Sequence, residues 1–241
     1  MIRTFRAFDP RSIKLVIFDL DGTLIDSRLD LVHSVNAALR HIGRTELPDD
    51  VIASYVGDGA PVLIQRALGV DAARGEVVDE ALVRKGLEFF LKYYREHKLD
   101  HTTVYPGVAE ALAAIQNSAS QSQNGGPRKL AVLSNKPVVP SRAIIEALGL
   151  GQFFSQVYGG NSFPTKKPDP EGARRLLEEY GIQPQQAAIV GDSHVDVTTG
   201  RNAGMVTVGV TYGFAPHTLQ NEPPDVLVDH PSELATLFAA P

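Results

Sequence analysis

Short apolar runs rich in valine and isoleucine recur along this 241-residue chain, and helical patterns separate them. Such runs are typical of strands that are buried on both faces of a parallel sheet. The clearest runs span 14–19, 129–134, 187–192 and 205–210, with weaker candidates at 156–159 and 225–229. Helical patterns span 107–116, 141–148, 170–180 and about 195–203. This alternation predicts an α/β fold, a doubly wound, Rossmann-like parallel sheet with helices on both faces.

One long segment interrupts the alternation after the first strand. Between about residue 26 and residue 101 the apolar residues follow helical spacing only. The two clearest sets are Leu31, Val35, Ala38, Leu39 and Ile42, and Val83, Leu87, Phe90, Leu91 and Tyr94. We therefore predict a core domain formed by 1–26 and 104–241, with an inserted α-helical cap domain at 27–103. Such a module is suited to act as a lid that excludes water and reads the substrate.

Composition narrows the class of function. The net charge of −5 and the pI of about 5.8 argue against a nucleic-acid partner, since no basic stripe is present to offset phosphate charge. The chain has no cysteine, which excludes disulfides and thiolate catalysis. No apolar run approaches the ~20 residues of a membrane-spanning helix, and residues 1–10 do not resemble a signal peptide. We therefore expect a cytoplasmic protein with no membrane partner.

Two carboxylates stand at the end of the first predicted strand. Asp19 and Asp21 are two residues apart, so they share a face of an extended chain, and Gly22 follows as a turn residue. Paired acids at one site can bind a hard cation, supply a nucleophile and transfer protons. Ser134 and Asp192 fall at the carboxyl ends of two further predicted strands, where sites form in parallel sheets. The pattern predicts metal-assisted chemistry on an anionic substrate.

Four segments resemble the motif set of the haloacid dehalogenase superfamily. They are Asp19-Leu-Asp-Gly-Thr23, Ser134-Asn135-Lys136, Lys167-Pro168 and Gly191-Asp-Ser-His-Val-Asp196. They occur in the order of that superfamily, and the long first gap holds the helical insert, as in its members with a helical cap. The resemblance covers nearly the whole chain from about residue 14 and implies phosphoryl-transfer chemistry.

The resemblance also implies a role for each motif. Asp19 would attack phosphorus and form an aspartyl-phosphate, and Asp21 would be the acid and base for the leaving group and the hydrolytic water. Ser134 would hydrogen-bond a transferring oxygen, and Lys167 would offset charge on the nucleophile and the phosphoryl group. The further substrate-binding residues that we expect are Thr23, Asn135, Gly57, Asp58 and Gly59.

Mg²⁺ is the cofactor that the resemblance implies. Its protein ligands would be Asp19, the backbone carbonyl of Asp21 and Asp192, while Asp196 would be an outer ligand or orient the metal-bound waters. Oxygen ligands together with retained waters suit this ion.

Two further segments resemble phosphoglycolate phosphatases within the same superfamily. The segment Val56-Gly-Asp-Gly-Ala60 resembles their cap loop, in which glycines let the backbone approach a substrate. An ordinary turn between helices is the alternative for this segment. Thr211-Tyr-Gly-Phe214 follows a predicted strand, and we expect Tyr212 and Phe214 to be packing residues rather than substrate contacts.

Each motif also has a purely structural alternative. The Asp19 segment could be an Asx turn, and Ser134 or Asp192 could cap the next helix. Lys167 could form a solvated pair with its neighbour Lys166. Asp196 could be a structural partner within its helix.

The acid at position 21 separates the functions of the superfamily. Dehalogenases lack it because a halide leaves without a proton, and phosphonate-cleaving members use a cap lysine near the position of Ala60. We expect hydrolysis of a small phosphorylated metabolite, 2-phosphoglycolate above others, by a monomer or homodimer. The alternatives are another sugar phosphate, a nucleotide or pyrophosphate as substrate, a sugar phosphomutase, or a non-enzymatic binding protein. The polar segment 117–128 is predicted to be a surface loop, without an assigned function.

Overall fold

The structure, a computed structural model, describes residues 1–69, 79–118 and 126–239. The chain divides into two compact units. One unit joins Met1–Asp26 to Val104–Pro241, and the other is Ser27–Thr103. Residues 119–125 of the predicted surface loop lie outside the described residues. Within the described ranges, no helix has both the length and the apolar character needed to cross a membrane.

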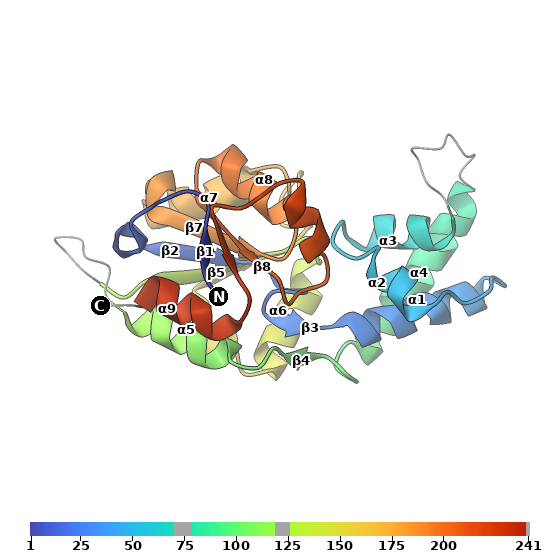
Figure 1. The fold of residues 1–241 in the computed structure, drawn as a ribbon. Helices are drawn as coiled ribbons and strands as arrows, with labels where there is room; N and C mark the ends of the chain where they lie inside the picture. Colours follow the sequence, from blue (N-terminus) through green and yellow to red (C-terminus); the bar gives the residue numbers. More distant parts are fainter. Residues whose placement is uncertain (70–78, 119–125, 240–241) are drawn as a thin grey trace. The chain divides into compact units, whose positions relative to one another are not determined.

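The first unit is built on a seven-stranded sheet with the order β1-β9-β8-β7-β2-β5-β6 (Figure 1). Its strands are β1 (Arg3–Thr4), β2 (Leu15–Phe18), β5 (Lys129–Leu133), β6 (Gln156–Tyr158), β7 (Ala187–Gly191), β8 (Val206–Val210) and β9 (Val226–Val228). Every pairing from β9 to β6 is parallel. The prediction of a doubly wound α/β sheet is therefore confirmed.

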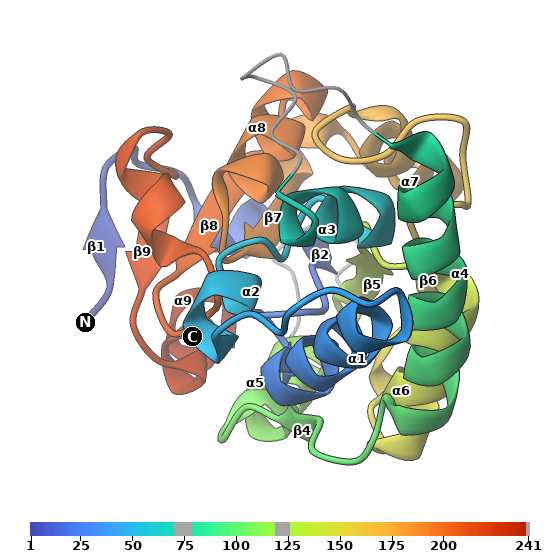
Figure 2. The same cartoon turned by 90° about the vertical axis from the view of Figure 1, so that its right-hand side faces the viewer.

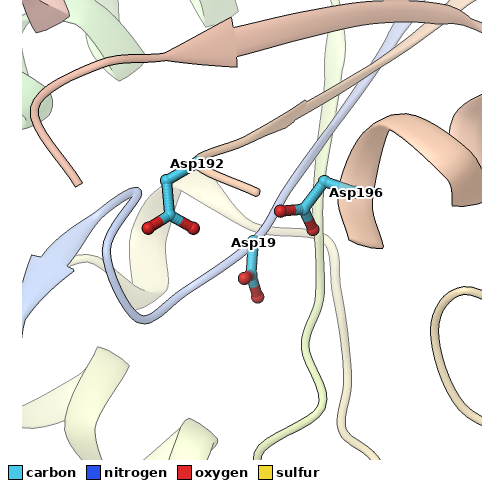
Figure 3. A group of neighbouring side chains, drawn as sticks. All are labelled: Asp19, Asp192 and Asp196. Atoms are coloured by element: carbon cyan, nitrogen blue, oxygen red, sulfur yellow. The ribbon is translucent and has the colours of Figure 1, made fainter. Parts of the chain in front are cut away.

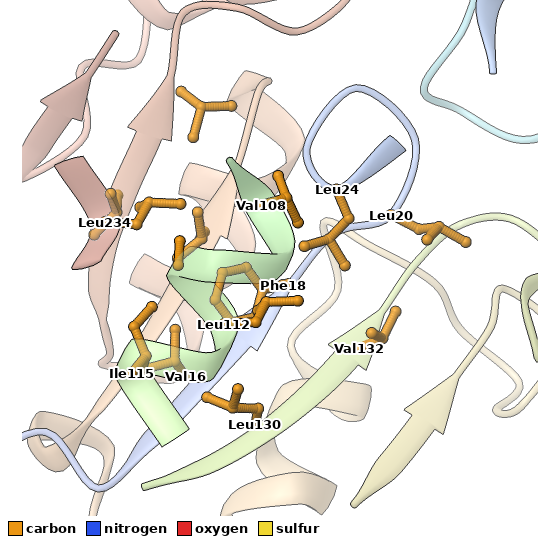
Figure 4. Packing of buried hydrophobic residues seen from close by; sticks show 14 of the residues in the cluster. Val16, Phe18, Leu20, Leu24, Val108, Leu112, Ile115, Leu130, Val132 and Leu234 are labelled. Carbon is orange, nitrogen blue, oxygen red and sulfur yellow. The ribbon is translucent and has the colours of Figure 1, made fainter. Parts of the chain in front are cut away.

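The central strand β2 is buried on both faces. Val16 and Phe18 join an apolar cluster on one face, and Leu15 and Ile17 join a second cluster on the other (Figure 4 shows the first). All four side chains are fully buried. Because successive strand residues point to opposite faces, a continuous apolar run is what a strand covered on both sides requires.

Helices cover both faces of this sheet (Figure 1). They are α5 (Val108–Asn117), α6 (Val138–Ala147), α7 (Glu171–Tyr180), α8 (His194–Ala203) and α9 (Pro231–Ala239). Residues of α5, α6 and α9 join the cluster of Phe18, whereas residues of α7 and α8 join the cluster of Ile17. Burial of apolar surface on both faces, at about 25 cal/mol per Å², stabilises this unit.

Two elements of the first unit do not follow from the sequence patterns. The strand β1 is only two residues long and pairs antiparallel with β9 at the edge of the sheet. It is held there by ion pairs of the amino terminus and Arg3 with Asp229. Helix α9 packs against α5 and closes the apolar cluster with Leu234 and Phe238. Tertiary contacts rather than local periodicity determine β1, because two residues carry no readable period.

The second unit is helical. Its helices are α1 (Arg28–His41), α2 (Asp49–Ala53), α3 (Ala60–Ala67) and α4 (Glu80–His97) (Figure 2). Pro61 lies in the first turn of α3, where its missing N–H costs no helical hydrogen bond. Leu91 was expected on the apolar face of α4 but is 40% exposed, while Val83, Phe90 and Tyr94 are buried. The apolar face of α4 is thus narrower than its periodicity indicates.

The chain passes between the units through two short strands. The strands β3 (Ile25–Asp26) and β4 (Thr103–Val104) form a separate two-stranded sheet. Within the helical unit, the buried carboxylate of Asp30 accepts hydrogen bonds from the backbone N–H groups of His101 and Thr102. The Thr102 hydroxyl donates to it as well, at 2.6 Å. This carboxylate ties the start of the helical unit to its end.

Candidate active site

The sheet brings three predicted site residues to one edge. The register pairs Phe18 of β2 with Val132 of β5 and with Val190 of β7. Asp19 follows Phe18 directly, and Ser134 and Asp192 lie two residues beyond the partners of Phe18. These residues, far apart in the sequence, therefore lie at the carboxyl ends of three adjacent parallel strands.

Three carboxylates form the centre of this edge. One oxygen from each of Asp19, Asp192 and Asp196 lies within 4.8 Å of the other two (Figure 3). Asp192 and Asp196 are 4% and 1% exposed. Burial raises the pKa of Asp192 to about 7, and the charges of Asp196 and Asp19 add to that rise. Burial likewise raises the pKa of Asp19 to about 6, with the Lys167 charge opposing the rise. Several negative charges that lie close together with little water around them favour the binding of protons or of a cation.

Asp192 is held by a loop that follows β8. Its Oδ2 accepts hydrogen bonds from the backbone N–H groups of Phe214, at 2.6 Å, and Ala215, at 3.0 Å. The carboxylate lies against two glycines: a Cβ on Gly22 would stand 2.3 Å from its Oδ2, and a Cβ on Gly213 would stand 2.3 Å from its Cβ. Gly22 also has a φ of +81°, which favours glycine. Both glycines are therefore required for the position of Asp192.

Lys167 joins two of the three carboxylates. Its Nζ lies 2.5 Å from Asp196 Oδ1 and 3.0 Å from Asp19 Oδ1, and the lysine is 4% exposed. Burial alone would lower the pKa of Lys167, but the charges of Asp19 and Asp196 more than offset this effect and raise it. The ammonium group is therefore charged at neutral pH. The backbone of Lys167 is held in part by Asn135, whose Nδ2 donates to the Lys167 carbonyl at 3.0 Å.

Asp196 has two kinds of partner. Its Oδ1 accepts from Lys167, and its Oδ2 accepts from the backbone N–H and the hydroxyl of Ser193, at 3.2 and 2.8 Å. Ser193 is the N-cap of α8, and Asp196 is the third residue of that helix, as in a capping box. Asp196 is thus a structural partner of its helix and a member of the carboxylate trio at once.

Asp21 and Ser134 complete this edge. Both oxygens of Asp21 accept from Lys136 Nζ at 2.7 Å. The Ser134 hydroxyl accepts from the backbone N–H of Lys136 at 3.3 Å, and the Ser134 N–H donates to the Tyr158 carbonyl. Ser134 does not cap the following helix, because the N-cap of α6 is Pro137.

Two other structural alternatives are excluded by position. Asp192 is not the N-cap of α8, because Ser193 occupies that place. Lys167 is buried and ion-paired, whereas its neighbour Lys166 is exposed, so the two do not form a solvated pair.

Four further residues are predicted to bind substrate. Thr23 is fully buried, and its carbonyl accepts from the Tyr212 hydroxyl at 3.1 Å. Gly57, Asp58 and Gly59 belong to the helical unit, in the loop before α3. In that loop Asp58 pairs with Arg66 at 2.7 Å, and Arg66 also donates to the Tyr55 carbonyl.

Comparisons with known proteins agree with this geometry. A family described as Haloacid dehalogenase-like hydrolase matches residues 16–210, which is more than half of the chain. The chain belongs to the haloacid dehalogenase-like hydrolase family. The resemblance seen in the four sequence motifs is thereby confirmed.

Relatives within this family are similar over most of their length. The chain is 42% identical over 205 residues to a phosphoglycolate phosphatase of Chromobacterium violaceum, covering 85% of this chain and 88% of the relative. It is 35% identical to a phosphoglycolate phosphatase of Haemophilus influenzae, covering 93% and 98%. The crystal structure of a predicted phosphoglycolate phosphatase from Haemophilus somnus superposes with a TM-score of 0.82 at 32% identity, covering 94% of this chain and 98% of the other.

Sequence reasoning missed two parts of the site in this haloacid dehalogenase-like hydrolase. The first is the pair of backbone N–H groups from Phe214 and Ala215, since the TYGF segment was expected only to pack. The second is Lys136, which stands in a recognised motif but received no role. The glycine in the TYGF segment and the lysine two residues after Ser134 were the available signals, but no sequence pattern shows which carboxylate they meet.

Proposed function

We propose that this haloacid dehalogenase-like hydrolase is a Mg²⁺-dependent phosphomonoesterase that converts 2-phosphoglycolate to glycolate and phosphate. The observation that carries the proposal is the trio Asp19, Asp192 and Asp196 with the Lys167 ammonium among its carboxylates. This arrangement offers a nucleophile, a cation site and a fixed positive charge at one strand edge. The substrate is supported by the names of relatives that match nearly the whole chain.

The donor set fits Mg²⁺. Every candidate ligand is an oxygen, as this ion prefers, and the trio is closely spaced. At full ionisation, Asp19, Asp21, Asp192 and Asp196 carry four negative charges, against two positive charges on Lys136 and Lys167. A divalent cation would balance the remaining two charges and relieve the repulsion that raises the pKa of Asp192. When bound, Mg²⁺ supplies positive charge to the phosphoryl oxygens and orients them.

Asp19 is the proposed nucleophile. Its carboxylate would attack phosphorus opposite the leaving oxygen, so that an Asp19–phosphorus bond forms while the bond to the alkoxide breaks. Lys167 stands 3.0 Å from Asp19 Oδ1 and would offset the charge that builds up on the equatorial oxygens. Ser134, at the end of the neighbouring strand, would hydrogen-bond one of those oxygens.

Asp21 is the proposed acid and base. As an acid it would start with a proton on one carboxyl oxygen, the other still facing Lys136, and give that proton to the glycolate alkoxide, which is a poor leaving group without it. As a base it would then take a proton from the water that hydrolyses the aspartyl-phosphate. Its separation from Asp19 by one residue keeps the two carboxylates on one strand end while giving them different partners.

Substrate recognition is assigned to residues outside the carboxylate trio. We propose that Asn135 contacts the phosphate group of the substrate and that the loop Gly57–Gly59 of the helical unit recognises its organic group. Thr23 is kept as a supporting residue, because its side chain is fully buried. In this proposal, phosphate chemistry resides in the sheet unit and discrimination in the helical unit.

Phosphate release by the purified protein tests the function. With Mg²⁺ present, 2-phosphoglycolate should be hydrolysed faster than hexose phosphates, nucleotides or pyrophosphate. Asp19→Asn should lower kcat by ~10⁴-fold or more, because the variant lacks the carboxylate that forms the covalent intermediate. Asp9→Asn is the matched control, since Asp9 is a surface aspartate whose side chain is 53% exposed.

Two results would contradict the proposal in different ways. If no member of the panel releases phosphate, the phosphomonoesterase function is wrong. If a sugar phosphate is isomerised with no free phosphate, the chain is a phosphomutase on the same scaffold. Faster hydrolysis of another phosphate ester would leave the reaction class intact and replace the substrate.

A further inference from the structure

Lys136 and Lys167 serve the two catalytic carboxylates in different ways. The Lys167 ammonium is shared between Asp19 and Asp196. The Lys136 ammonium instead meets both oxygens of Asp21, each at 2.7 Å. A symmetric, bidentate contact of this kind restrains the rotation of a carboxylate as well as its position.

This contact is enclosed. The side chain of Lys136 is 6% exposed and that of Asp21 is 14% exposed. An ion pair so poorly hydrated is screened far less than a surface pair, and its partners are costly to separate. Lys136 is therefore a fixed part of the surroundings of Asp21.

The backbone that carries Lys136 is held from two sides. Its N–H donates to Ser134 Oγ, and its carbonyl accepts from the Gly160 N–H at 2.9 Å. The turn after β6 approaches this backbone so closely that a Cβ on Gly159 would lie 2.6 Å from the Lys136 carbonyl oxygen. A Cβ on Gly160 would lie 2.3 Å from the carbonyl oxygen of Asn135. The start of the lysine side chain is thus fixed by close backbone packing.

We infer that Lys136 is a positioning residue that fixes the carboxyl group of Asp21 for proton transfer to the departing alkoxide. The inference rests on the proposed phosphatase function and adds a residue to it. Lys136 forms no bond with phosphorus and receives no proton in this scheme. It acts through Asp21, so its contribution should matter only where the leaving oxygen needs a proton.

Two substrates distinguish a role in positioning Asp21 from a role at the phosphoryl group or in substrate binding. The alkoxide of 2-phosphoglycolate needs a proton to leave, whereas the nitrophenolate of p-nitrophenyl phosphate leaves without one. The ratio kcat/KM reports steps only up to departure of the leaving group, so hydrolysis of the aspartyl-phosphate does not affect the comparison. Lys136→Met should lower kcat/KM for 2-phosphoglycolate ~10²-fold or more, the usual size of a general acid contribution. The loss for p-nitrophenyl phosphate should stay below ~10-fold on the same reasoning.

The control variants use the same two substrates. Asp21→Asn should show the same selective loss, and Lys136→Met combined with Asp21→Asn should be no worse than Asp21→Asn alone, since both act through one group. Lys129→Met is the matched lysine control, because Lys129 is exposed at the opposite end of β5. Circular dichroism and thermal unfolding check that each variant is folded, and Lys136→Gln replaces Lys136→Met if the latter does not fold.

The outcomes distinguish the inference from the function on which it rests. Equal losses on both substrates would assign Lys136 to the phosphoryl group or to substrate binding and overturn the inference. Unchanged activity on both would overturn it as well. If the wild-type protein releases phosphate from neither substrate, the proposed function itself fails, and the positioning role fails with it.

Discussion

The strand-end site of the sheet unit and the Gly57–Gly59 loop of the helical unit both carry an aspartate paired with a basic residue, but in different surroundings. At the strand edge, the side chains of Lys167 and Asp196 are 2% and 1% exposed. In the helical loop, those of Arg66 and Asp58 are 39% and 32% exposed. Burial decides what such a pair can do. A buried charge alters the pKa of its neighbours, whereas a hydrated pair contributes little energy.

The comparison also separates two uses of glycine. Gly22 has a positive φ and lies against Asp192, so both its conformation and its lack of a side chain serve the carboxylate. Gly57 has a φ of +129°, but nothing lies within 4 Å of the position that its Cβ would take. Gly22 thus serves both backbone conformation and close packing, whereas Gly57 serves backbone conformation alone.

Among changes to these charge pairs, the largest expected effect follows from removing the buried ammonium at the strand edge. Lys167→Met should lower kcat/KM ~10²–10³-fold, as for other charge-stabilising groups. It should also destabilise the protein by about 3–5 kcal/mol at pH 7.5, because Asp19 and Asp196 lose their buried counter-charge. Steady-state kinetics and denaturant unfolding measure the two effects. The exposed Lys92→Met in the helical unit is the control, and a similar loss there would contradict the comparison.

Mg²⁺ affinity should depend strongly on pH. The pKa values of about 6 for Asp19 and about 7 for Asp192 mean that protons occupy these carboxylates at pH 5.5 and have largely left at pH 7.5. Because the ion competes with those protons, its affinity should be about 100-fold weaker at pH 5.5. Calorimetric titration at both pH values measures this ratio, and a pH-independent affinity would contradict the assignment of the trio.

The same pKa values have the opposite effect on stability. A rise in pH strengthens Mg²⁺ binding but reduces what these two carboxyl groups contribute to the stability of the folded state when no ion is bound. Both folded-state values lie above the ordinary carboxyl value of 3.8. With chelator present, the contribution of these two carboxyl groups to stability should therefore fall as the pH rises from about 4 to about 7, because the unfolded chain has already released those protons. Thermal unfolding with and without Mg²⁺ separates this effect from that of the ion.

A smaller effect is expected from a pair of glycine substitutions. Gly22→Ala and Gly43→Ala each force alanine to a positive φ, which costs about 1–2 kcal/mol. Only Gly22→Ala also places a Cβ against the Asp192 carboxylate, since nothing lies within 4 Å at Gly43. Gly22→Ala alone should lose the Mg²⁺-dependent rise in unfolding temperature. Equal responses to Mg²⁺ in the two variants would show that Asp192 tolerates displacement.

The smallest effect is expected in the helical loop. A double-mutant cycle with Asp58→Asn and Arg66→Met should give a coupling energy of about 0.2–1 kcal/mol, as for other hydrated pairs. The coupling should weaken further in 1 M salt, where screening is nearly complete. Chemical unfolding of the four proteins measures it. A salt-independent coupling well above this range would mean that the loop resembles the strand edge.

The sequence was most informative where burial is continuous. The runs that became β2, β5, β7 and β8 were predicted to within about one residue at each end, because a strand covered on both faces must be apolar throughout. The edge strand β1 was not predicted, since its two exposed residues owe their conformation to contacts with β9. Helix α9 likewise became evident only through its packing against α5.

For the site, the sequence predicted which residues lie at strand ends but not which side chains contact one another. The alternation of strands and helices placed Asp19, Ser134 and Asp192 at the carboxyl ends of strands, and the structure shows those strands as neighbours. Their chemical roles stay predictions until the variants are measured. The contact of Lys136 with Asp21 could not be predicted, because the two residues are 115 residues apart.

By itself, the sequence determined the class of sheet, the order of the motifs and the residue types at the strand ends, since these depend on local periodicity and chain order. Tertiary structure alone decided which charged groups pair with one another. In the fold, Lys167 forms ion pairs with Asp19 and Asp196, and Lys136 forms one with Asp21. Two backbone N–H groups donate hydrogen bonds to Asp192. The physical reason is that electrostatic interaction depends on distance and burial, and both are set by packing between segments far apart in the chain.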